Sequence, residues 1–137
     1  MGSHGIRDRV AIVGMGCSRF AEHWDKGVDE LLLDATGEAF AATGIGKDDV
    51  DAYWLGTAQS GMSGMVLAKP LGLEGKPVTR VENMCATGSE AFRNACYAVA
   101  SGAYGKPWLA IIPAIITLAT LGAQHRTPPK TAAEAIA

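Results

Sequence analysis

One cysteine stands where a folded chain would place a nucleophile. Cys85 lies between a short β-branched run, 76–82, and an alanine-rich stretch, 86–104, that contains no proline. The first pattern is typical of a buried strand and the second of a helix. The first turn of a helix has unpaired backbone N–H groups and the positive end of the helix dipole, which favour the thiolate, the reactive form of cysteine. Cys85 is therefore the candidate catalytic nucleophile.

The alternative role for Cys85 is that of a small buried residue that only fills the core, which is common for free cysteines. The small residues that follow Cys85, including Gly88, favour the catalytic role because they leave room for a substrate to approach. Asn83 comes shortly before Cys85 and is expected to hydrogen-bond the loop that holds it, with substrate binding as the second possibility. Gly88 and Asn83 are thus candidate substrate-binding residues.

The sequence around Cys85 also resembles a known motif. From Val81 to Ala91 it reads VENMCATGSEA, which is similar to the nucleophilic-cysteine motif of thiolases. The sterol-carrier-protein-type thiolases and acetyl-CoA acetyltransferases form the branch it resembles most. Residues 9–20 are similar to the opening strand of that family, and residues 51–57 to its second strand. The resemblance covers residues 6–104, the amino-terminal half of the family pattern, and stops there.

This resemblance implies a thiolase-like α/β half-fold with a mostly parallel sheet and a buried helix that carries the nucleophile. It implies acyl-CoA acyltransfer through an acyl-cysteine at Cys85, with the coenzyme A thioester as substrate and no other cofactor. In the family, a histidine and a second cysteine from the carboxy-terminal half act as base and acid. No matching motif follows here, so the chain is expected to be impaired in full turnover. Two alternatives remain: a non-catalytic thiolase-like subunit that binds acyl-CoA or a protein partner, and a structural fragment without activity.

Two methionines are the remaining candidates for substrate contact. Met62 and Met65 lie in a glycine-rich segment, where flexible apolar side chains could line an acyl chain. Packing at a subunit interface is the favoured alternative for both.

The other cysteines and the histidines give no second catalytic group. Cys96 would lie about 16 Å from Cys85 along one helix, too far to act with it. Cys17 follows the first expected strand and is interpreted as structural. Three cysteines without paired spacing predict neither a disulfide framework nor a metal site. The histidines all stand in surface-like contexts, with the last the least improbable base: His4, His23 and His125.

The pattern along the chain predicts alternating strands and helices, which indicates an α/β fold. The expected elements are a strand at 9–14, a helix at 28–43, a strand at 52–57, a loop with a short helix at 59–73, a strand at 77–82 and a helix at 86–104. The last helix is apolar around most of its circumference and has one polar stripe of Glu90, Arg93, Asn94 and Ser101. Such a helix is normally buried on more than one side, so it should lie between two layers. A homo-oligomer or a second thiolase-like chain would supply the missing layer.

The chain is expected to divide into a thiolase-like half, 1–104, and a divergent apolar tail, 105–137. Truncation, internal deletion or a frameshift would each explain the tail. Its apolar stretch is shorter than the roughly 20 residues that cross a bilayer, so a strand and a helix, 108–112 and 113–121, are favoured over a membrane span. A net charge of −2 over 137 residues gives no sign of nucleic-acid binding. The first residues do not form a secretory signal, so a cytoplasmic protein is expected.

Overall fold

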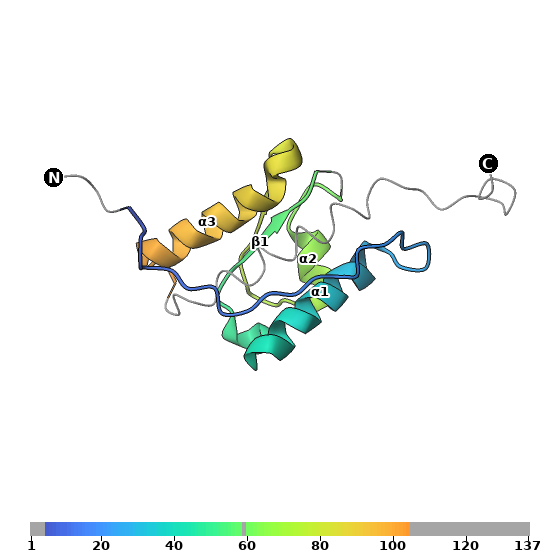
Figure 1. The fold of residues 1–137 in the computed structure, drawn as a ribbon, viewed down its shortest axis with the longest axis horizontal. Coiled ribbons are helices and arrows are strands. Elements are labelled where there is room, and N and C mark those ends of the chain that lie inside the picture. Colours follow the sequence, from blue (N-terminus) through green and yellow to red (C-terminus); the bar gives the residue numbers. More distant parts are fainter. Residues whose placement is uncertain (1–4, 59, 105–137) are drawn as a thin grey trace, which may run out of the picture.

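The computed structural model of the chain describes residues 5–58 and 60–104. Over these residues helices alternate with short strands, as an α/β fold requires (Figure 1). The elements are α1 (Val28–Thr43), η1 (Lys47–Asp49), β1 (Tyr53–Gly56), α2 (Met65–Leu71), β2 (Val78–Val81), η2 (Met84–Ala86) and α3 (Thr87–Ser101), where η marks a short 3₁₀ helix. The expected α/β class is confirmed.

The two strands form a small parallel sheet. Tyr53 lies opposite Val78 at one end of the ladder, and Gly56 lies opposite Val81 at the other. Backbone pairing continues just past the strand ends, where the N–H of Thr57 donates to the carbonyl of Val81 at 3.2 Å. Parallel neighbours need a crossover connection, and α2 supplies it between β1 and β2. Both strands therefore end at the same edge of the sheet, where the chain turns into η2 and α3.

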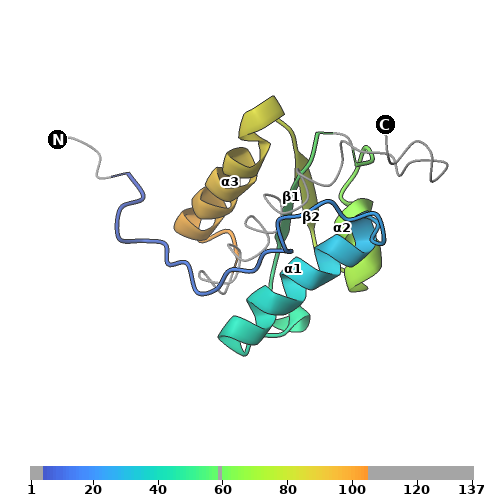
Figure 2. The same ribbon diagram turned by 45° about the vertical axis from the view of Figure 1, so that its right-hand side comes forward.

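β1 is buried on both faces and separates two hydrophobic cores. Figure 2 shows the strands between α3 on one side and α1 with α2 on the other. Alternate side chains of a strand point to opposite faces. One core joins β1 to α1 and α2, and consists of Leu32, Ala35, Val50, Tyr53, Leu55, Leu67 and Leu71. The other joins β1 to α3, and consists of Ala52, Trp54, Ala91, Ala95, Cys96 and Val99. The sheet therefore lies between α3 on one side and α1 with α2 on the other.

α1 has the bounds that the sequence predicts, and hydrogen bonds fix both of its ends. At its start, the Glu30 carboxylate accepts a hydrogen bond of 2.9 Å from the backbone N–H of Gly27. At its end, Gly44 adopts a left-handed φ of 68° and its N–H returns to the carbonyl of Phe40. The expected short helix in 59–73 is also confirmed, as α2.

The predicted strand at 9–14 is wrong for the described residues. These residues are not paired as a strand, and Ile12 is 59% exposed. A strand forms only beside a neighbouring strand, and in residues 5–58 and 60–104 the sheet consists of β1 and β2. The segment that follows lies against α1 instead. A Cβ atom placed on Gly16 would be 2.0 Å from the carbonyl oxygen of Ala35, so glycine is required for this close approach.

The remaining strands and the last helix are shorter than expected. β1 and β2 are each one residue shorter at both ends than the predicted strands. α3 begins at Thr87 and ends before Gly102, which has a left-handed φ of 71°. α3 buries one side against β1 through Ala91, Ala95 and Val99, while Tyr97 is half exposed. The second layer expected around α3 stays a prediction. The tail, 105–137, with its predicted strand and helix, lies outside the described residues, and the boundary before it stays a prediction. In the described part of the chain, no helix has both the length and the apolarity to span a membrane.

Candidate active site

Cys85 occupies the middle of the 3₁₀ turn η2, which joins β2 to α3, and its side chain is exposed. The predicted order of strand, cysteine and helix is therefore present. The sequence places Cys85 within the first helical turn, whereas α3 begins two residues later at Thr87. The nucleophile candidate thus lies on a separate tight turn at the edge of the sheet where the strands end.

The turn contains an unusual backbone conformation immediately before Cys85. Met84 has a φ of 48°, in the left-handed region that residues with a Cβ rarely adopt. This conformation costs about 1–2 kcal/mol for an L-residue, so neighbouring contacts must hold it. One such contact is a 2.8 Å hydrogen bond from the backbone N–H of Met84 to the carboxylate of Glu82.

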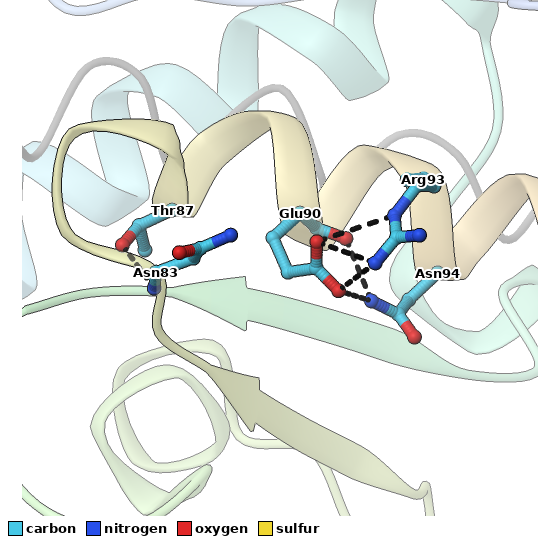
Figure 3. A network of polar contacts seen from close by, with 5 residues as sticks. All are labelled: Asn83, Thr87, Glu90, Arg93 and Asn94. Atoms are coloured by element: carbon cyan, nitrogen blue, oxygen red, sulfur yellow. Dashed lines mark hydrogen bonds and ion pairs between the residues drawn. The ribbon is translucent and has the colours of Figure 1, made fainter.

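Thr87 provides two further contacts to the same turn. Its hydroxyl oxygen accepts the backbone N–H of Asn83 at 2.8 Å (Figure 3), and its O–H donates to the carbonyl of Met84 at 2.7 Å. Thr87 is fully buried. We call these two hydrogen bonds the Thr87 bridge. The expected link between Asn83 and the loop is present through its backbone N–H, while substrate binding by Asn83 stays a prediction.

The role of Thr87 was not predicted from the sequence, where this residue is only one of the small neighbours of Cys85. A signal was available in the spacing. Thr87 is the first residue of α3 and follows Asn83 by four positions. A threonine at this spacing can hydrogen-bond the backbone that precedes the helix. Gly88, another small neighbour of Cys85, is buried in the first turn of α3. Its contact with a substrate stays a prediction.

The polar stripe of α3 forms a network next to the candidate site (Figure 3). The Glu90 carboxylate accepts hydrogen bonds from Arg93 at 2.6 Å and from the side-chain amide of Asn94 at 2.8 Å. The hydrogen bonds from Arg93 and then Asn94 lower the pKa of Glu90. Arg93 also lies 5.7 Å from the ring centre of Tyr97. Because these donors occupy the Glu90 carboxylate and lower its pKa, its basicity is reduced and it is a poor candidate for a general base.

The two candidate methionines lie in and just after the loop that leaves the end of β1. Met62 is 98% exposed, and Met65, the first residue of α2, is 63% exposed. This loop starts at the same edge of the parallel sheet as the Cys85 turn. Arg80 of β2 links the two regions, because its guanidinium donates to the carbonyl of Thr57 at 2.8 Å. Contact of either methionine with a substrate stays a prediction.

The other two cysteines are placed differently from Cys85. Cys96 is a buried residue of α3 in the core shared with β1, and burial raises the pKa of its thiol. Cys17 is exposed, and its Sγ lies 3.1 Å from the carbonyl oxygen of Ser18, to which it donates.

Among the described residues, His23 is the histidine present, and a ring nitrogen of its side chain lies 2.6 Å from the carbonyl oxygen of Arg19. His4 and His125 lie outside the described residues. Residues 5–58 and 60–104 contain no group of three or more histidine, cysteine or acidic side chains that could hold a metal ion.

Comparison with known proteins agrees with the motif around Cys85. The chain is 38% identical over 104 residues to the acetyl-CoA acetyltransferase of Methanocaldococcus jannaschii, covering 72% of this chain and 26% of that protein. It is 34% identical over 103 residues to the acetyl-CoA acetyltransferase of Methanothermobacter thermautotrophicus, covering 71% and 27% respectively. It is also 36% identical over 92 residues to chicken (Gallus gallus) sterol carrier protein 2, covering 63% and 16%. No protein-family model matches the chain.

The resemblance to thiolases is therefore confirmed as a partial one. The chain is a partial thiolase-type sequence, and it spans about a quarter of the length of the acetyl-CoA acetyltransferases that it matches.

Proposed function

We propose that Cys85 accepts the acyl group of an acyl-CoA thioester, as the first step of a thiolase-type acyl transfer. The observation that carries the proposal is the exposed thiol of Cys85 on a tight turn between β2 and α3. The relatives named acetyl-CoA acetyltransferase support the same chemistry. An exposed nucleophile on a fixed turn suits a substrate as large as coenzyme A.

In the proposed step, the thiolate of Cys85 attacks the thioester carbonyl and forms a new carbon–sulfur bond. The bond between the carbonyl carbon and the coenzyme A sulfur then breaks. Coenzyme A leaves as a thiol after it takes up the proton that Cys85 released, so the products are S-acyl-Cys85 and free coenzyme A. The start of α3 carries the positive end of the helix dipole, which favours negative charge on this turn.

The proposal ends at the acyl-cysteine. Transfer of the acyl group to a second substrate needs a base, and the histidine of the described residues, His23, contacts the carbonyl of Arg19 rather than the Cys85 turn. We therefore propose that the base comes from outside residues 5–58 and 60–104, from a partner chain or a second thiolase-like half. Selection among acetyl, fatty and larger acyl groups would also depend on the chain or half that supplies this base.

A second function is favoured by one observation. Phe20 is 88% exposed and Met62 is 98% exposed, and contact with a partner would remove these apolar side chains from water. The chain would then be a non-catalytic thiolase-like subunit that binds acyl-CoA or a protein partner, including a second copy of itself.

Release of coenzyme A separates these two functions. Purified chain mixed with excess acetyl-CoA should release one equivalent of free coenzyme A in a single rapid phase, measured by chromatography with ultraviolet detection. The reaction stops at one equivalent because the acyl group has no acceptor. Binding of acetyl-CoA in a calorimeter without release would favour the non-catalytic subunit. The absence of both release and binding would refute acyl transfer and acyl-CoA binding, and would leave a protein partner as the ligand of the non-catalytic subunit.

A further inference from the structure

We infer that Thr87 is a positioning residue, whose buried hydroxyl fixes the turn that presents Cys85. The effect on acyl transfer rests on the proposed function, whereas the effect on the turn does not. The relevant contacts are the two hydrogen bonds of the Thr87 bridge, and Figure 3 shows the one to Asn83.

The bridge spans the nucleophile along the chain. Its two backbone partners, Asn83 and Met84, precede Cys85, whereas Thr87 follows it at the first position of α3. A second bond joins the same ends, because the backbone N–H of Thr87 also donates to the carbonyl of Met84. The hydroxyl therefore connects the end of the β2 loop directly to the helix, with Cys85 held between them.

The hydroxyl of Thr87, rather than its methyl group, is the part of the side chain that holds the turn. Thr87 is fully buried, and its hydroxyl both donates and accepts a hydrogen bond. Valine has nearly the same shape but would leave the N–H of Asn83 without this acceptor. The bond that ties the backbone before Cys85 to the start of α3 would then be lost, so the turn is expected to rearrange.

The bridge also explains how Met84 keeps its left-handed conformation. The bond from Thr87 holds the carbonyl of Met84, while Glu82 holds its N–H. Hydrogen bonds therefore fix both the N–H and the carbonyl of Met84, whose φ is 48°. Glycine adopts this φ without strain. Met84→Gly should therefore partly restore the turn when the Thr87 hydroxyl is absent.

The test compares Thr87→Val with Thr87→Ser, with the double variant Thr87→Val/Met84→Gly, and with Thr36→Val as a matched control. Thr36 is also a buried threonine, but its hydroxyl bonds the carbonyl of Leu32 within α1, away from Cys85. The first measurement is hydrogen exchange at the amide of Asn83, followed by NMR. The second is the rate at which acetyl-CoA acetylates Cys85.

In Thr87→Val, exchange at Asn83 should be about tenfold faster, and acetylation about ten- to a hundredfold slower, because small displacements of a nucleophile have large effects. Thr87→Ser should behave like the parent chain, and the double variant should recover part of the acetylation rate. Thr36→Val should change neither quantity. If Thr87→Val does not fold, Thr87→Ala provides the same comparison with Thr87→Ser.

Unchanged exchange at Asn83 in Thr87→Val would overturn the inference. Unchanged acetylation in a variant with faster exchange would also overturn it, since the turn would then not position the nucleophile. If the parent chain is not acetylated at all, the proposed function fails. The exchange rates and the rescue of the Asn83 amide by Thr87→Ser then decide whether Thr87 fixes the turn.

Discussion

Replacement of Cys85 by alanine is expected to abolish formation of the acyl-enzyme. The reason is chemical, because alanine has no sulfur to form the new thioester, and the turn that carries position 85 is held by backbone contacts and by Thr87. Cys85 is exposed and is a residue of η2, not of the buried faces of α3, so alanine should not disturb the core. The measurement is the intact mass of each variant after brief exposure to acetyl-CoA.

The two other cysteines provide matched controls for this prediction. Cys96→Ala should keep the adduct, because the thiol of Cys96 is buried and burial raises its pKa, which leaves less thiolate at neutral pH. Cys17→Ala should also keep it. Cys17 is the stricter control, because its thiol is exposed like that of Cys85 but lies on a different segment. Equal loss of the adduct in all three variants, or an adduct that persists in Cys85→Ala, would refute the assignment.

Truncation of Leu32 should give a large loss of stability outside the candidate site. Leu32 is fully buried in the core between α1, α2 and β1. Leu32→Ala removes buried apolar contacts and leaves a cavity, at a cost of about 3 kcal/mol in the free energy of unfolding. This is a large part of the stability of a small domain. Chemical denaturation followed by circular dichroism measures the change.

The next residue along α1 provides the control. Leu33 is 46% exposed, so the same substitution there removes little buried surface. Leu33→Ala should change the free energy of unfolding by no more than about 0.5 kcal/mol. Equal effects at the two positions would mean that the observed face of α1 is not the one that packs on the sheet.

Much of this fold follows from local sequence pattern. The apolar spacing of 28–43 and the glycine after it predict α1 within its observed bounds. The β-branched run before Cys85 predicts β2, and the alanine-rich stretch after it predicts most of α3. These elements are predictable because short-range periodicity and end residues determine them.

The errors arise where the structure depends on particular contacts rather than on periodicity. The apolar run at 9–14 has the composition of a strand, but a strand also needs a neighbour, and the described residues place this segment outside the sheet. At the candidate site, the sequence predicted that Cys85 lies between a strand and a helix, but not the bond between the Thr87 hydroxyl and the backbone of Asn83. The left-handed conformation of Met84 could not be predicted either, because it depends on those same contacts.

The most direct test is to locate the acetyl group on the unmodified chain. The protein is exposed briefly to acetyl-CoA, digested under acidic conditions that preserve thioesters, and mapped by tandem mass spectrometry. The proposed function predicts one acetyl group, on the peptide that contains Cys85 and on its sulfur. A folded protein without an adduct, or with acetyl groups spread over Cys17 and surface lysines, would contradict it.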